Sequence, residues 1–492
     1  MDLVFDLVKV LENKKFQKSE IVDKLILSTT ENVYGNFYAA IANNDIKNTD
    51  EAIAFLYGKI NKENINKYRQ FKFRFKRKLL NTLFFVDVAN VDFKNNIQKT
   101  YFEGIKTMFQ VDIIQKYGGN NNLVKEIILD NINTIKKYKL NYILSEYSLK
   151  LINYYTLNGD YKSLAKEIKN YNNYNQLYLE ETNAFILFNE VNVLAGSPKP
   201  NTKLLLTKLP VLNEIIVKAK SNLSKSYAMM AKIIYYEYFA NYKECMAVCF
   251  ETLKILNKSE SLVKQSYTAI VNYFIVRMHF QLKNFNQCKT YINSINGKML
   301  GYNWFLINEI NFKLELNLDN LTQAKLVYNK VINHKLYNAL PERVIEMWNL
   351  HLFYLDFYQS IKKNEPFNQN VFTLINSSTN LYHDKSEFNF SLIIIKILYL
   401  LYKQKYTEAS KVIGTLRVYR SRYLKGKKYN RPKQFIEELI LLDKNNYEKK
   451  ISKTHFLQKS DSNIILDSEI ILYENLIDII NTMLYPTSNP SH

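Results

Sequence analysis

The chain has 492 residues, more than one compact core usually holds, so it should form two or more domains or one elongated repeat array. Glycine (11) and proline (8) occur at roughly a third of their average frequency. This argues against a β-rich fold, which needs both residues at its tight turns. The net charge of +21 would by itself point to polyanions. However, the favoured residues Lys, Asn, Ile, Tyr and Phe all have A/T-rich codons, which offers a genomic origin for part of the bias.

Signals for export and membrane insertion are not expected in this chain. The first six residues, MDLVFD, carry acids where a signal peptide carries bases. The longest apolar run, 392–402, is interrupted by Lys396 and is shorter than the ~20 residues that cross a bilayer. The stretch 464–484 is apolar but carries acidic residues at amphipathic spacing. We therefore expect both stretches to be core helices and the protein to be cytoplasmic, without a membrane segment.

Residues 1–119 are predicted to form an N-terminal helical module. The sequence NTDEA at 48–52 is typical of a capped helix start. Long helices are expected at about 63–86 and 93–117, the second one stopped by a Gly-Gly pair.

A turn recurs about every forty residues in the rest of the chain. Its copies, each closing one apolar helical stretch and opening the next, are Asn241-Tyr242, Asn284-Phe285, Asn320-Leu321 and Lys405-Tyr406. Three residues after each opener comes a small residue: Cys245, Cys288, Ala324 or Ala409. Further openers are expected at Tyr161 and Tyr447, and the two long gaps predict degenerate units near Asn201 and Phe367.

This pattern resembles the tetratricopeptide-like superfamily, whose second helix begins with a similar aromatic-x-x-Ala signature. The resemblance covers roughly 120–460 and implies an all-α fold, an α-solenoid of antiparallel helix pairs with a period of about 40 residues. The units are longer than the standard repeat and lack its consistent Trp, Gly and Pro positions. We expect the repeat region to span 120–484 and a tail to follow at 485–492.

Catalytic signatures are absent from the sequence, which holds no GxxxxGK, GxGxxG, GxSxG or HExxH motif. Cys245 and Cys249 form an i, i+4 pair with Cys288 one unit away, which is a possible metal site. The alternative is that these cysteines are small buried residues, because Cys245 and Cys288 occupy the slot that alanine fills in other units. We favour the second interpretation and expect no enzyme, no cofactor and no metal.

Two basic segments contain seven of the nine arginines. Residues 67–78 hold seven bases and no acid, and 417–433 hold eight bases and no acid. Guanidinium groups bind phosphate or carboxylate bidentately and stack on aromatic rings, as lysine cannot. The candidate residues for binding a partner or a polyanion are Arg69, Arg74, Arg77, Lys78, Arg417, Arg420, Arg422, Lys425, Lys427, Lys428 and Arg431.

The first basic segment should be a helix with an apolar stripe that includes Tyr68, Phe75 and Leu79. Phe73 and Leu80 suggest a second apolar flank, so we expect this helix to pack on two sides. The second segment is expected to be partly a loop, with tyrosines between its bases. Alternatively, the arginines pair with carboxylates of adjacent repeats while the aromatic residues are core.

The repeats and the missing catalytic motifs favour a non-enzymatic scaffold that binds a protein or peptide partner on its concave face. The alternative is a nucleic-acid-binding or regulatory protein that uses the basic and aromatic residues of 67–78 and 417–433. A hydrolase built on helical repeats is a third, more remote alternative.

Overall fold

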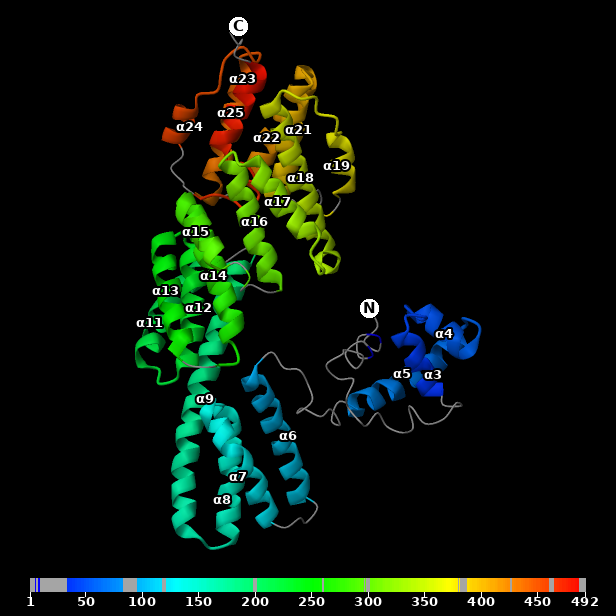
Figure 1. The fold of residues 1–492 in the computed structure, drawn as a ribbon, viewed down its shortest axis with the longest axis vertical. Coiled ribbons are helices and arrows are strands. Elements are labelled where there is room, and N and C mark those ends of the chain that lie inside the picture. Colours follow the sequence, from blue (N-terminus) through cyan, green and yellow to red (C-terminus); the bar gives the residue numbers. More distant parts are fainter. Residues whose placement is uncertain are drawn as a thin grey trace. The chain divides into compact units, whose positions relative to one another are not determined.

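The computed structural model describes residues 5, 8, 33–82, 95–116, 121–197, 201–258, 261–295, 297, 301–378, 380, 387–424, 427–459 and 464–485. Within these residues the regular elements are helices and there is no strand, which confirms the all-α prediction (Figure 1). The chain divides into two compact units, Met1–Thr182 with Glu260–Leu262, and Asn183–Ser259 with Val263–His492. The predicted boundary at 119/120 and most of the predicted tail lie outside the described residues.

The first helices of unit one are α3 (Val33–Ala42), α4 (Thr49–Tyr57) and α5 (Lys62–Thr82). The predicted cap of α4 is confirmed, because the side chain of Asn48 accepts a hydrogen bond from the Glu51 N–H at 3.0 Å. These helices share a core in which Phe37 of α3 contacts Tyr68 and Phe75 of α5 edge-on.

The prediction that α5 packs on two sides is wrong. Tyr68, Phe75 and Leu79 are buried, but Phe73 is 69% exposed and Leu80 is 40% exposed. The aromatic residues of α3 provide one apolar surface, and α5 lies on it with a single stripe. The opposite face of α5 is therefore a solvent surface with Phe73 on it.

The remaining helices of unit one are α6 (Asn96–Lys116), α7 (Asn121–Lys137), α8 (Asn141–Leu157) and the first part of α9 (Tyr161–Gly196). Helix α6 packs on both α7 and α8. Gly104 permits this close approach, since a Cβ atom there would lie 2.8 Å from the Cδ1 atom of Ile143.

Unit two continues from α9 with many sequentially packed helices (Figure 1). They are α10 (Thr202–Leu206), α11 (Lys208–Lys218), α12 (Asn222–Tyr238), α13 (Tyr242–Lys258), α14 (Lys264–Gln281), α15 (Phe285–Ile295), α16 (Tyr302–Asn317), α17 (Leu321–Ile332), α18 (Glu342–Lys363), α19 (Val371–Ser377), α21 (Glu387–Tyr402), α22 (Tyr406–Tyr423), α23 (Asn430–Lys444), α24 (Lys453–Lys459) and α25 (Tyr473–Leu484). Each of the pairs α12/α13, α14/α15, α16/α17 and α21/α22 is packed together, and α14 also contacts α12 and α16.

Helices begin at most of the predicted openers. The helices α9, α13, α15, α17 and α22 start at Tyr161, Tyr242, Phe285, Leu321 and Tyr406. The opener predicted at Tyr447 is wrong, because the next helix, α24, starts only at Lys453. Asn446 and Tyr447 have φ values of 50° and 61°, and two successive left-handed residues do not seed a right-handed helix.

One backbone turn connects these helix pairs. At the α12–α13 connection Ala240 has φ 55°, its N–H donates to the Glu237 carbonyl at 3.0 Å, and the Asn241 N–H donates to the Tyr236 carbonyl at 2.9 Å. This is the Schellman pattern. The carbonyl of Asn241 then accepts from the Cys245 N–H at 2.9 Å, so one residue closes a helix and starts the next.

The same turn recurs with other residues in the left-handed position. Lys283, Asp319 and Gln404 have φ values of 54°, 62° and 55° there, whereas the turn before α9 uses a glycine, Gly159. The turn therefore does not depend on glycine, which is why a chain with so little glycine can repeat it.

The small residues after the openers are core residues. Cys245, Cys288, Ala324 and Ala409 are fully buried. The Sγ atoms of Cys245 and Cys288 each lie 3.5 Å from a backbone carbonyl of the preceding helix, at Ile233 and Val276. Burial raises the pKa of the Cys288 thiol to about 12, which makes that thiol unreactive. The interpretation of these cysteines as small packing residues fits this geometry.

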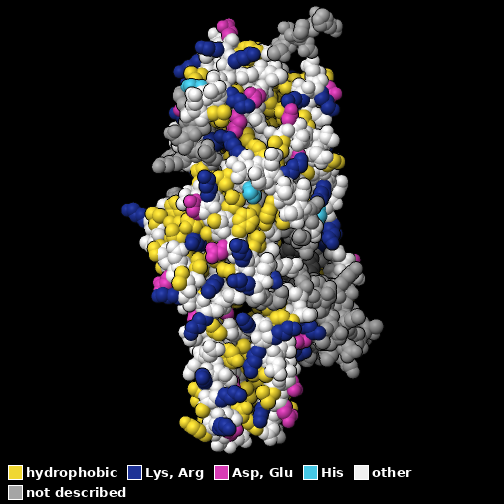
Figure 2. All heavy atoms as spheres, turned by 60° about the vertical axis from the view of Figure 1, so that its left-hand side comes forward, with side chains coloured by type: hydrophobic (Ala, Val, Ile, Leu, Met, Phe, Trp, Pro, Cys, Tyr) yellow, Lys and Arg dark blue, Asp and Glu magenta, His cyan; other side chains and the backbone are white. Residues whose placement is uncertain are grey.

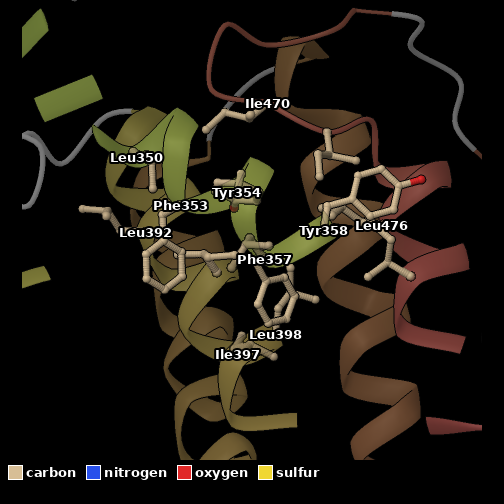
Figure 3. Close-up of a cluster of buried hydrophobic side chains, with 14 of the residues drawn as sticks. Leu350, Phe353, Tyr354, Phe357, Tyr358, Leu392, Ile397, Leu398, Ile470 and Leu476 are labelled. Atoms are coloured by element: carbon tan, nitrogen blue, oxygen red, sulfur yellow. The ribbon is translucent and has the colours of Figure 1, made fainter. Parts of the chain in front are cut away.

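The largest core of unit two surrounds α18. Figure 3 shows Leu350, Phe353 and Phe357 of this helix facing Leu392 and Ile397 of α21. Ile470 and Leu476, from the C-terminal part of the chain, belong to the same core (Figure 3). Residues far apart in the sequence thus close this end of the unit.

Candidate functional site

The segment 464–472 is mostly buried but is not helical, and it includes a turn in which the Glu469 N–H donates to the Leu466 carbonyl at 2.9 Å. It was predicted to be the start of a core helix, but α25 begins only at Tyr473, so that prediction is correct for 473–484 and wrong for the residues before it. Ile465, Glu469 and Leu472 are each 2% exposed or less. A buried chain without helical hydrogen bonds needs partners for its amide groups from elsewhere.

Side-chain amides of two helices supply these partners. The Gln281 Nε2 donates to the Ile465 carbonyl at 2.7 Å, and the Ile465 N–H donates to Gln281 Oε1 at 2.9 Å. The Asn317 Nδ2 donates to the Ile470 carbonyl at 3.0 Å, and the Leu472 N–H donates to Asn317 Oδ1 at 2.7 Å. Each side chain therefore binds the segment with a donor and an acceptor, as a neighbouring strand would.

Gln281 and Asn317 occupy the same place in consecutive helix pairs. Gln281 is the last residue of α14 and Asn317 is the last residue of α16, each two positions before the left-handed residue of its turn. One helical turn earlier on the same faces lie Arg277 and Lys313. We call these four residues the segment clamp.

The two basic residues of the clamp meet at Asp467 of the segment. The Arg277 guanidinium pairs with the Asp467 carboxylate and donates to Glu237 at 3.0 Å. The Lys313 ammonium donates to the Asp467 carbonyl at 2.6 Å. The Asp467 side chain is 51% exposed, and the partial desolvation that would raise its pKa is outweighed by the charges of Arg277 and Lys313, so the pKa lies below its ordinary value.

A second ionic cluster fixes the following residues. The Arg431 side chain is 1% exposed and its Nη2 donates to Glu469 Oε1 at 2.5 Å and to Glu474 Oε2 at 2.7 Å. Lys283 lies 2.5 Å from the other oxygen of Glu474. Burial opposes the charge of Glu474, yet Arg431 and Lys283 lower its pKa to about 2.

A pocket of about 260 Å³ opens beside Asp467. Its lining residues combine charged, aromatic and aliphatic groups: Tyr273, Arg277, Tyr302, Leu306, Glu309, Ile310, Lys313, Arg343, Val344, Met347, Phe388 and Asp467. None of these described residues is a serine, cysteine or histidine. Arg277 pairs with Asp467, and Lys313 pairs with Glu309. Because these charged groups already bind one another, the pocket is suited to polar contacts with a bound group and less suited to acid–base catalysis.

The first predicted basic segment lies on α5 with its arginines outward. Arg69, Arg74 and Arg77 are exposed, and Arg69 contacts Asn66 at 3.4 Å. Lys78 is half-buried, with its ammonium 5.2 Å from the centre of the Tyr34 ring. The arginines of this segment therefore remain available to an outside partner.

The second predicted basic segment is divided between surface and core. Arg417 and Arg422 are exposed on α22, and Lys428 is exposed with its ammonium 4.6 Å from the Tyr429 ring centre. Arg420 pairs with Glu437 at 2.8 Å, and Arg431 is the buried cation described above. Lys425 and the side chain of Lys427 lie outside the described residues. On the face drawn in Figure 2, Lys and Arg side chains are scattered among uncharged ones.

Sequence reasoning missed the segment clamp. A usable signal exists, since a basic residue eight positions and an amide four positions before the opener occur at both Phe285 and Leu321. The equivalent positions before Tyr242 are Ile234 and Tyr238, so the signal is confined to two neighbouring units.

Comparisons of this chain with protein families, with curated proteins and with solved structures find no match. Among the described helices, none combines the length and the apolar character needed to cross a bilayer. No cluster of three or more His, Cys, Asp or Glu side chains among the described residues is arranged to hold a metal ion.

Proposed function

We propose that the helix pairs of residues 120–484 are units of a tetratricopeptide-like α-solenoid with a period of about 40 residues. The recurring Schellman turn, the buried small residue near the start of α13, α15, α17 and α22, and the contacts between α12, α14 and α16 support this proposal. Such arrays bury their apolar stripes between neighbours and leave long concave surfaces for partners.

We propose further that the protein is a non-enzymatic scaffold that binds a non-helical peptide segment of a partner protein. The observation that carries this is the segment clamp, which binds backbone groups of a non-helical stretch of the protein's own chain, residues 464–472. Contacts to backbone amides hold a non-helical chain with little regard to its sequence, while Arg277 adds a preference for an acidic side chain. The helices α14 and α16 thus present side chains that can bind the backbone and an acidic side chain of a peptide.

The test is binding of the full chain to an array of twelve-residue peptides, with affinities measured by fluorescence polarisation. The array includes the sequence of 464–475, IILDSEIILYEN. Asp467→Ala weakens the hold of the protein's own segment, so this variant should bind clamp-dependent peptides more tightly than the wild type.

The double variant Gln281→Ala/Asn317→Ala should lose about tenfold or more in affinity, because two pairs of buried hydrogen bonds to the peptide backbone are removed. Its matched control is Gln287→Ala/Asn329→Ala, which makes the same changes at exposed positions on α15 and α17 of the same units. The proposal fails if neither the wild type nor Asp467→Ala binds any peptide, or if the control loses as much affinity as the clamp variant.

A further inference from the structure

The solvent face of α5 joins an exposed aromatic ring to exposed guanidinium groups. Phe73 is 69% exposed, and Arg69 and Arg77 lie one helical turn before and after it on the same face. Arg74 is exposed beside them. We call these four residues the α5 outer face.

The geometry of this face is fixed by the core beneath it. Tyr68, Phe75 and Leu79 are buried on the opposite side of α5 and pack against α3. The ring of Phe75 is 5.2 Å from the Phe37 ring, centre to centre, in an edge-on contact. Rotation of α5 to hide Phe73 would expose this aromatic core, so the α5 outer face is held toward solvent.

The positive charge of this face is not neutralised within the described part of the chain. The single acidic residue of α5, Glu63, pairs with Lys67 at 2.6 Å. Arg69 contacts a neutral amide, and neither Arg74 nor Arg77 forms an ion pair with any described residue. A partner of opposite charge is therefore the fitting one.

We propose that the α5 outer face binds a single-stranded polynucleotide, with phosphates on Arg69, Arg74 and Arg77 and a base stacked on Phe73. Single strands present both groups together, since their bases are free to stack on an aromatic side chain while their phosphates need charge. This role goes beyond peptide binding and uses residues of the other compact unit.

A membrane surface fits this face less well. An interfacial helix inserts its broad apolar stripe into the bilayer, but the apolar stripe of α5 is already occupied by the core around Phe37. Phe73 and Leu80 are the exposed large apolar side chains of α5, too few for stable insertion.

The experiment measures the fluorescence anisotropy of a labelled oligouridylate of about twenty nucleotides while the full chain is titrated into it, at several salt concentrations. Phe73→Ala should weaken binding about fivefold or more with little change in salt dependence, because it removes stacking and no charge. Phe73→Trp should restore affinity. Arg74→Gln/Arg77→Gln should make the slope of log affinity against log salt shallower by about 1.4, the effect of two phosphate contacts on a single strand.

The control is Arg417→Gln/Arg422→Gln, which removes two exposed arginines from α22 and so lowers the net charge equally. Each of four results overturns the proposal: no binding at low salt, full affinity in Phe73→Ala, the same loss in the α22 control as in the α5 variant, or tighter binding of a duplex of equal length. Binding to anionic phosphatidylserine vesicles or to polyglutamate that depends on Phe73, without binding to the oligouridylate, would assign the face to a different partner. Because the substituted side chains are exposed, the thermal unfolding of all variants should match that of the wild type.

Discussion

The two basic segments both combine bases with aromatic residues and hold no acid, but their structures differ. Residues 67–78 place their arginines on the exposed face of α5, whereas 417–433 place Arg431 in the core and pair Arg420 with Glu437. What separates them is the supply of carboxylates from elsewhere in the chain. Glu469 and Glu474 reach Arg431 from the C-terminal part, and no described carboxylate pairs with Arg74 or Arg77. Whether the arginines of a basic run are buried, paired or exposed therefore depends on which carboxylates from elsewhere in the chain reach them, and not on the run itself.

The largest expected effect comes from removing the buried cation. Arg431→Met should destabilise the protein by about 3–5 kcal/mol, because Glu469 and Glu474 would be left as poorly compensated buried charges. Arg417→Met, the same change on the exposed part of the segment, should stay within about 0.5 kcal/mol. Urea unfolding measures both, and equal effects would remove the distinction between the buried and exposed arginines.

A buried base without a carboxylate partner should instead lose its charge. His351 is fully buried, its Nε2 atom has no hydrogen-bond partner in the structure, and the nearest carboxylate oxygen, on Glu309, lies 3.9 Å away. Burial, and after it the charge of Lys313, lowers the pKa of His351 to about 3. The ring is therefore neutral in the folded protein at pH 7.

This gives a pH dependence with a defined sign. The unfolded chain protonates His351 near its ordinary pKa of about 6.5 and the folded chain does not, so stability is full above that pH and falls as the pH drops toward 3. The contribution is about 1.4 kcal/mol per pH unit below 6, and His351→Phe should abolish it. Urea unfolding at pH 7, 6 and 5 checks this, and parallel losses in wild type and variant would show that His351 is not the group responsible.

A glycine in the turn that leads into α22, the helix carrying Arg417 to Arg422, should increase the stability of the protein. Gln404 adopts φ 55° there, which costs a residue with a Cβ atom about 1 kcal/mol. Gln404→Gly should raise the midpoint of thermal unfolding, while Gln404→Ala, which keeps the strain, should not. A lower midpoint for the glycine variant would mean that the left-handed turn is not formed as described.

The smallest expected effect belongs to the surface pair of the second segment. The side chains of Arg420 and Glu437 are 38% and 44% exposed, so water and salt screen their attraction. Arg420→Ala should cost about 0–1 kcal/mol, and less still in high salt. A double-mutant cycle with Glu437→Ala measures the pair itself, and a coupling near that of the Arg431 cluster would break the ranking of buried over exposed pairs.

The sequence allowed the turns to be predicted because they are local. The opener at Tyr242 and the small residue Cys245 belong to one turn, and both took the expected places. The exposure of Phe73 and the burial of Arg431 depend on residues tens of positions away, on α3 and in 464–475, which no local pattern specifies. This is also why a helix was expected over the whole of 464–484: the apolar pattern is visible in the sequence, but the amide groups of Gln281 and Asn317 that replace helical hydrogen bonds are not.

The most direct test of the segment clamp is hydrogen exchange at the amides of Ile465 and Leu472, which donate to Gln281 and Asn317. Both amides should exchange as slowly as the core of α14 in the wild type, and much faster in Gln281→Ala/Asn317→Ala while α14 itself stays protected. Fast exchange of these two amides in the wild type would contradict a clamp that holds the backbone of 464–472, and with it the proposed mode of peptide binding.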